Sequence, residues 1–115
     1  MIRIRKTVGA PALCVALISL HSALSRAESP PVSIAQRDER FHPNRIELKR
    51  GQSLKVTNED RFVHHVFVDS PGMKYDSGEQ RPGHVLSIPF EKTGEFVLEC
   101  AIHLKMKLRV TVKDD

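Results

Sequence analysis

Three residues near the C-terminus have the types and spacing of metal ligands. Cys100, His103 and Met106 follow one another at intervals of three and provide a thiolate, an imidazole and a thioether. One more imidazole from elsewhere in the chain would complete a set of two His, one Cys and a weakly bound Met. That set suits a copper ion that alternates between Cu(I) and Cu(II), because sulfur ligands favour the cuprous ion and imidazole tolerates both states. A zinc site would more often use a further Cys or His in place of Met.

The missing imidazole has two adjacent candidates, His64 and His65. Both lie in the apolar run 62–68, which is typical of a central strand. Side chains alternate between the two faces of a strand, so the two rings are expected on opposite sides. Because apolar neighbours occur on both faces, the alternation does not choose between the two residues.

The elements that must position these residues are predicted to be short strands, because apolar and polar residues alternate with period two. The expected strands cover residues 46–49, 54–57, 62–68, 85–90, 95–100 and 106–113. The first two are predicted to form a hairpin around Gly51, and residues 69–83, which contain three Gly or Pro turn signals, a long loop. This pattern predicts an all-β fold, either a β-sandwich or a small Greek-key barrel, and a barrel of the OB type stays open.

The N-terminal residues have the three-part layout of a secretory signal peptide. Residues 2–6 contain three basic residues, and residues 7–20 are mostly apolar. Ser25 and Ala27 provide the small residues at the −3 and −1 positions of a cleavage site. We therefore expect residues 1–27 to be a signal peptide that is cleaved after Ala27.

Two other interpretations of this segment are less compatible with the sequence. A membrane anchor would need a longer uncharged run, and Pro11 interrupts the run that is present. A lipid anchor on Cys14 is disfavoured because only a short apolar run precedes that cysteine. We expect residues 28–115 to form one domain in the periplasm, without membrane insertion of the mature chain.

Length, composition and charge restrict the class of protein. The chain has 115 residues, of which 40% are apolar and 28% are charged, which suits one small domain and excludes a large multidomain enzyme. The formal net charge of +4 suggests a polyanionic partner. The predicted cleavage, however, removes four of the 18 basic residues and no acidic one, which leaves 14 of each. We therefore expect no nucleic-acid partner.

The predicted cleavage also changes the number of cysteines. Cys14 belongs to the predicted signal peptide, so Cys100 is the one cysteine of the mature chain and cannot form an intramolecular disulfide. An unpaired thiol in an oxidising compartment is a liability unless it is protected, and metal ligation is one form of protection.

The predicted mature chain resembles the cupredoxins, the type I or blue copper proteins, and in particular their small plastocyanin-like and amicyanin-like members. The similarity covers nearly all of residues 34–113, and its most specific element is the loop that carries Cys100, His103 and Met106. Two residues separate Cys100 from His103, and two separate His103 from Met106, which resembles the short amicyanin-type loop. Weaker matches occur at Phe41, Pro43, Gly51, Asn58, Asp60, Val66 and Gly94.

The resemblance implies a cupredoxin-like Greek-key β-sandwich of about seven to eight strands. It also implies one copper ion bound by His64, Cys100, His103 and Met106, with His64 favoured over His65 by its place in the motif. In plastocyanin-like members an asparagine commonly follows the first ligand and ties the ligand loops together, whereas this chain has His65. In this family the outer edge of the downstream histidine, here His103, is the usual exit point for the electron.

Two functions would use this site. The first is a one-electron carrier between transient redox protein partners, in which Met106 is the weak axial ligand. The second is a periplasmic protein that binds copper and delivers it through the same ligands. A thiol enzyme fits less well, because a nucleophile needs an exposed thiolate and Cys100 shares an apolar face with Phe96 and Leu98. We expect a monomeric electron carrier that is not an enzyme.

Export provides a direct test of the predicted boundaries. The protein recovered from the periplasm is expected to begin at Glu28 on amino-terminal sequencing, because cleavage follows Ala27. Recovery of a chain that begins at Met1 in the membrane fraction would contradict cleavage and favour the anchor.

Overall fold

The computed structural model describes residues 2, 7–19 and 29–115. The predicted cleavage site after Ala27 lies outside the described residues. Residues 7–19 contain no regular helix or strand. Within the described part of the chain, no helix is long and apolar enough to cross a membrane.

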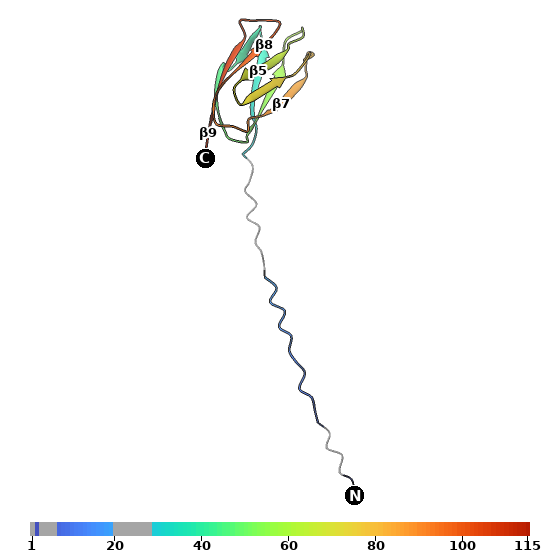
Figure 1. Ribbon diagram of the computed structural model, residues 1–115. Helices are drawn as coiled ribbons and strands as arrows, with labels where there is room; N and C mark the ends of the chain where they lie inside the picture. The colour runs from blue at the N-terminus through green and yellow to red at the C-terminus, as the bar shows by residue number, and fades with distance from the viewer. Residues whose placement is uncertain (1, 3–6, 20–28) are drawn as a thin grey trace.

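Residues 29–115 form two sheets that together contain nine strands (Figure 1). The strands are β1 (Val32–Arg37), β2 (Arg40–His42), β3 (Arg45–Lys49), β4 (Ser53–Asn58), β5 (Val66–Ser70), β6 (Met73–Asp76), β7 (Val85–Pro89), β8 (Gly94–Cys100) and β9 (Lys107–Lys113). One sheet has the order β2-β1-β4-β7 and the other the order β3-β9-β8-β5-β6. The all-β sandwich is therefore confirmed, and the OB-type barrel is excluded because the two sheets share no strand.

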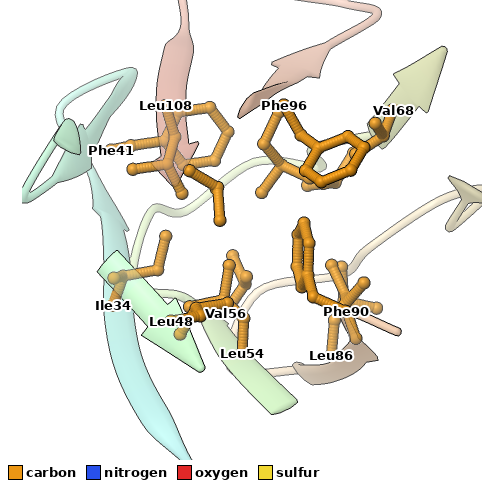
Figure 2. Packing of buried hydrophobic residues seen from close by; sticks show 14 of the residues in the cluster. Ile34, Phe41, Leu48, Leu54, Val56, Val68, Leu86, Phe90, Phe96 and Leu108 are labelled. Carbon is orange, nitrogen blue, oxygen red and sulfur yellow. The ribbon is translucent and has the colours of Figure 1, made fainter. Parts of the chain in front are cut away.

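The hydrophobic core lies between the two sheets. Alternate side chains of each strand point into this layer, so β9 buries Leu108, Val110 and Val112 while its other side chains lie outside the core. Figure 2 shows Phe96 of β8 on one side of this layer and Leu54 of β4 on the other. The predicted buried face of the last strand is confirmed.

The predicted hairpin of residues 46–49 and 54–57 is wrong. β3 pairs with β9, whereas β4 pairs with β1 and β7, so the turn at Gly51 carries the chain from one sheet to the other. Leu48 and Leu54 are both buried, but from opposite sides of the core. The alternation of apolar residues defines which face of a strand is buried, and it does not define the neighbouring strand.

The middle of the chain also differs from the prediction. β5 begins at Val66 rather than at Phe62, and the residues before it form a loop. The predicted loop 69–83 contains β6, which is antiparallel to β5 across a tight turn in which Gly72 has a φ of 85°. The Gly and Pro signals mark the turns, but they do not show whether the residues that follow pair with a neighbour.

A two-residue turn joins β1 to β2. Asp38 and Glu39 lie between the paired residues Arg37 and Arg40 and have φ values of 52° and 55°. Such tight hairpin turns favour a positive φ at both central positions, because the backbone twist then matches the twist of the strands. The turn directs the backbone amides of both residues toward the loop that precedes β5.

Burial predicts very different effects for two Leu-to-Ala substitutions. Leu54 is fully buried, whereas Leu104 is 75% exposed. Leu54→Ala is expected to lower the free energy of unfolding by about 2–5 kcal/mol, because it removes packed methyl groups and leaves a cavity. Leu104→Ala is expected to change it by less than about 0.5 kcal/mol. Urea unfolding of the metal-free protein, followed by circular dichroism, measures both. Equally small effects would contradict the position of the core.

Candidate metal centre

The loop between β8 and β9 carries three of the predicted ligands. Cys100 is the last residue of β8, and Met106 immediately precedes β9. Between them the chain turns, and the N–H of Met106 donates to the carbonyl of His103 at 2.9 Å. A short loop thus holds a thiol, an imidazole and a thioether at one end of the sandwich.

His64 comes to this loop from the residues before β5. β5 pairs with β8, with Val66 opposite Cys100. The N–H and the carbonyl of His64 both bond to the backbone of Gln80, at 3.0 and 2.7 Å. Strand pairing and this isolated bridge together place His64 beside Cys100, 36 residues away in sequence.

The donor atoms of three predicted ligands converge. The Sγ of Cys100 lies 3.7 Å from the Nδ1 of His64 and 3.7 Å from the Nδ1 of His103. The three donor atoms all lie within 4.8 Å of one another. Metal–sulfur and metal–nitrogen bonds of about 2.3 and 2.0 Å that meet at 120° place their donor atoms about 3.7 Å apart. The three side chains therefore fit around one ion, and their donor types suit copper.

The donors differ in exposure. Cys100 and His64 are fully buried, and Met106, which is 2% exposed, belongs to the same buried cluster as Cys100. The side chain of His103 is 21% exposed. An ion held here would be shielded on most sides, with the ring of one ligand reaching the surface.

An aromatic ring packs against both imidazoles. The ring centroid of Phe62 lies 5.3 Å from that of His64 and 5.2 Å from that of His103. The two imidazole centroids are 5.1 Å apart. Phe62 itself is 40% exposed, so it covers the imidazoles on one side and meets solvent on the other.

A buried carboxylate fixes the ring of His64. The Nε2 of His64 lies 2.8 Å from the Oδ2 of Asp60, whose side chain is 7% exposed. When the Nε2–H of His64 donates a hydrogen bond to this carboxylate, Nδ1 carries no proton and is free to bind a metal. Nδ1 is the nitrogen that faces Cys100. Burial raises the pKa of Asp60, but hydrogen bonds from His64 and from the amides of Glu39 and Asp38 outweigh it and lower the pKa below its ordinary value. Asp60 is therefore an ionised partner for the ring.

Asp60 is itself held by the β1–β2 turn. The amide of Asp38 donates to its Oδ1 at 2.7 Å, and the amide of Glu39 donates to its Oδ2 at 3.2 Å. The N–H of Asp60 donates to the Oδ1 of Asn58 at 2.9 Å. Two separate segments of the chain thus hold Asp60, and through Asp60 they hold the ring of His64.

The ring of His65 points away from the donor atoms. Its Nε2 lies 2.5 Å from the Oδ1 of Asp76, and its side chain is 30% exposed. Its backbone contacts the site instead, with the N–H 3.5 Å from the Sγ of Cys100 and the carbonyl accepting from Ala101 at 2.8 Å. Of the two adjacent histidines, the structure brings His64 together with Cys100 and His103.

Buried amide side chains support the loop of His64, and two of them, Gln36 and Gln80, had no signal in the sequence. Gln36 donates to the side-chain oxygen of Gln80 at 2.8 Å, and Gln80 donates to two backbone carbonyls. Asn58 donates to the carbonyls of Phe62 and Gln80 at 2.8 and 3.0 Å. Glutamine is mostly a surface residue, so a fully buried pair of glutamines is not expected from composition or periodicity.

The contact between Asp60 and His64 predicts an effect on copper affinity. Asp60→Asn removes the charge that accepts the Nε2 proton, so the affinity is expected to fall by about 10–100-fold. Asp76→Asn is the matched control, because it removes the same charge from the partner of His65, and it is expected to leave the affinity unchanged. Competition with a chelator measures the dissociation constants. Equal losses in the two variants would contradict a specific action of Asp60 on His64.

Solved structures with this fold include copper proteins. A Cu-containing nitrite reductase from Thermus scotoductus gives a TM-score of 0.69 at 26% sequence identity, covering 77% of this chain and 24% of that chain. The reduced Cu(I) form of an amicyanin mutant gives 0.67 at 14% identity, covering 76% and 87%. A purple cupredoxin from Nitrosopumilus maritimus gives 0.64 at 21% identity, covering 71% and 99%. The described domain therefore has the fold of whole small cupredoxins.

Sequence comparisons agree with the fold. The methylamine utilization protein MauL of Methylophilus methylotrophus is 30% identical over 89 residues, which cover 72% of this chain and 51% of the relative. The chain thus spans about half the length of this curated relative. The family model of the cupredoxin-like domain matches residues 9–112, which are most of the chain. Sequence, fold and donor set agree, and this protein is a member of the cupredoxin-like family with copper as its cofactor.

Proposed function

We propose that this protein is a one-electron carrier that binds one copper ion through His64, Cys100, His103 and Met106. The observation that supports this most strongly is the convergence of three donor atoms in a site that is buried except at the ring of His103. Bound copper would supply a couple between Cu(I) and Cu(II). The chain then has three tasks: to hold the donors, to exclude water and to present one ligand edge to partners.

The donors are held by contacts within the protein. Asp60 orients the ring of His64, and the backbone N–H of His65 lies beside the thiol of Cys100. The N–H of Met106 bonds to the carbonyl of His103 and closes the ligand loop. A site whose donors are already in place needs little rearrangement when an electron arrives or leaves. This favours rapid electron transfer.

The surface around His103 suits short-lived encounters with protein partners. Ile102 is 53% exposed, Leu104 is 75% exposed and Phe62 is 40% exposed. A small apolar surface of this kind lets a partner approach closely and then leave. We propose that redox partners contact this surface of a monomeric protein and exchange electrons through His103.

The curated relative suggests the class of partner. MauL is named as a methylamine utilization protein. We propose that an oxidoreductase of an amine-oxidising chain is the first partner to test.

The same site disfavours two other functions. A thiol enzyme needs an accessible thiolate, and Cys100 is fully buried. Copper delivery would need an acceptor to reach the ion, yet Cys100, His64 and Met106 are all buried, which favours retention. We propose that the protein is exported to the periplasm after cleavage at Ala27 and acts there as a carrier without catalytic activity of its own.

Visible and electron-spin spectroscopy tests the carrier and its ligands together. The copper(II) protein is expected to show an intense blue or green band from thiolate-to-copper charge transfer, which bleaches on reduction and returns on oxidation. His64→Ala is expected to abolish the band because it removes a donor beside Cys100. His65→Ala is the matched control and is expected to keep the band, because its ring points to Asp76.

Different outcomes of this experiment contradict different parts of the proposal. A band that survives in the His64→Ala protein would overturn the ligand assignment. A colourless copper protein without a reversible couple would overturn the carrier function. Loss of copper to a competing metal-free acceptor within a few redox cycles would favour delivery.

A further inference from the structure

The β1–β2 turn reaches both imidazoles of the metal centre. Its two amides hold Asp60, and Asp60 holds the ring of His64. The side chain of Glu39, from the same turn, extends to the other imidazole, where its Oε1 lies 3.7 Å from the Nε2 of His103. One two-residue turn therefore places a carboxylate at the outer nitrogen of each ring: its amides hold Asp60 against His64, and its own Glu39 faces His103.

We propose that Glu39 is a positioning residue whose carboxylate faces the outer nitrogen of His103 and lowers the reduction potential of bound copper. This inference rests on the proposed function, because it requires a copper couple at these ligands. It adds a residue outside the ligand set that determines how readily the carrier releases its electron.

The orientation of His103 makes its outer nitrogen the relevant atom. Its Nδ1 faces the Sγ of Cys100 at 3.7 Å, so Nε2 is the nitrogen that carries the proton when Nδ1 binds a metal. The separation of 3.7 Å between Nε2 and the Oε1 of Glu39 is longer than a direct hydrogen bond, but it places a negative charge beside the ring that would hold the copper. A negative charge at this position stabilises the more positive Cu(II) state relative to Cu(I). The expected consequence is a lower reduction potential.

The residue type at position 39 supports a role for its side chain. Two-residue hairpin turns with positive φ favour Asn, Asp and Gly. Asp38 matches this preference, whereas Glu39, with a φ of 55°, does not. The length of this side chain allows its carboxylate to come within 3.7 Å of the outer nitrogen of His103.

Exposure limits the size of the effect and makes it depend on salt. The side chain of Glu39 is 58% exposed and that of His103 is 21% exposed. Water and dissolved ions screen an interaction at such a place, and a higher salt concentration screens it more. The influence of Glu39 on the potential is therefore expected to be largest at low ionic strength.

Glu59 provides a matched control. It is a glutamate on the loop before β5, its side chain is 46% exposed, and its carboxylate pairs with Arg37 at 2.9 Å instead of with an imidazole. Glu59→Gln removes one negative charge from the same end of the molecule. A difference between the two Gln variants therefore reports the contact with His103 and not the net charge alone.

The test is the reduction potential of the copper-loaded protein, measured by mediated redox titration at low and at high salt. Glu39→Gln preserves the size of the side chain and the backbone amide that holds Asp60. It is expected to raise the potential above that of the unmodified protein, by more than Glu59→Gln does, and by less at high salt than at low salt. The unfolding midpoint of the metal-free variant is expected to stay unchanged. Glu39→Asp, which keeps the charge but shortens its reach, is expected to give a smaller rise.

An unchanged or lowered potential in Glu39→Gln would overturn the inference. An equal rise in Glu39→Gln and Glu59→Gln would also overturn it, because the effect would then belong to net charge. Absence of a reversible couple in the unmodified protein would overturn the proposed function and this inference with it. A failure of the proposed function is therefore seen in the unmodified protein, whereas a failure of this inference alone is seen only when the variants are compared with it.

Discussion

The pairing of β5 with β8 is the interaction on which the metal centre depends. Val66 lies opposite Cys100, and backbone contacts of His65 with the thiol and with Ala101 extend the pairing into the ligand loop. A slip of this register by one residue would turn every side chain of the strand to the other face. The core holds the register, because the apolar side chains of both strands would lose their burial in any such shift.

The supports of the two imidazoles differ in environment, and this difference separates their roles. His64 is held by the buried carboxylate of Asp60 and by backbone bonds to Gln80, within a frame of buried amides. His103 lies on the short ligand loop at the surface, and its outer nitrogen faces the exposed carboxylate of Glu39. The first ring is therefore held in the interior, and the second is the one that solvent and dissolved ions can reach.

His65 illustrates how the fold preserves the site when a side chain departs from the family pattern. The residue expected at this place is an asparagine that ties the ligand loops together, but here the ring turns outward to Asp76. The tie is made instead by the backbone of His65, which contacts both Cys100 and Ala101. Backbone groups are the same in every residue except proline, so this connection survives a change of side chain.

The amino-acid sequence by itself determined the donor types, the strand character of the chain and its family, because spacing within one loop and alternation along one strand are local properties. The tertiary structure decided which strands are neighbours, and so it separated β3 from β4 and paired β6 with β5. It also decided that His64 and not His65 lies with the other donors, that the backbone of Gln80 bonds to His64, and that the carboxylate of Glu39 lies near His103. These contacts join segments far apart in the chain, and the packing of two sheets around one core, which no local pattern encodes, determines them.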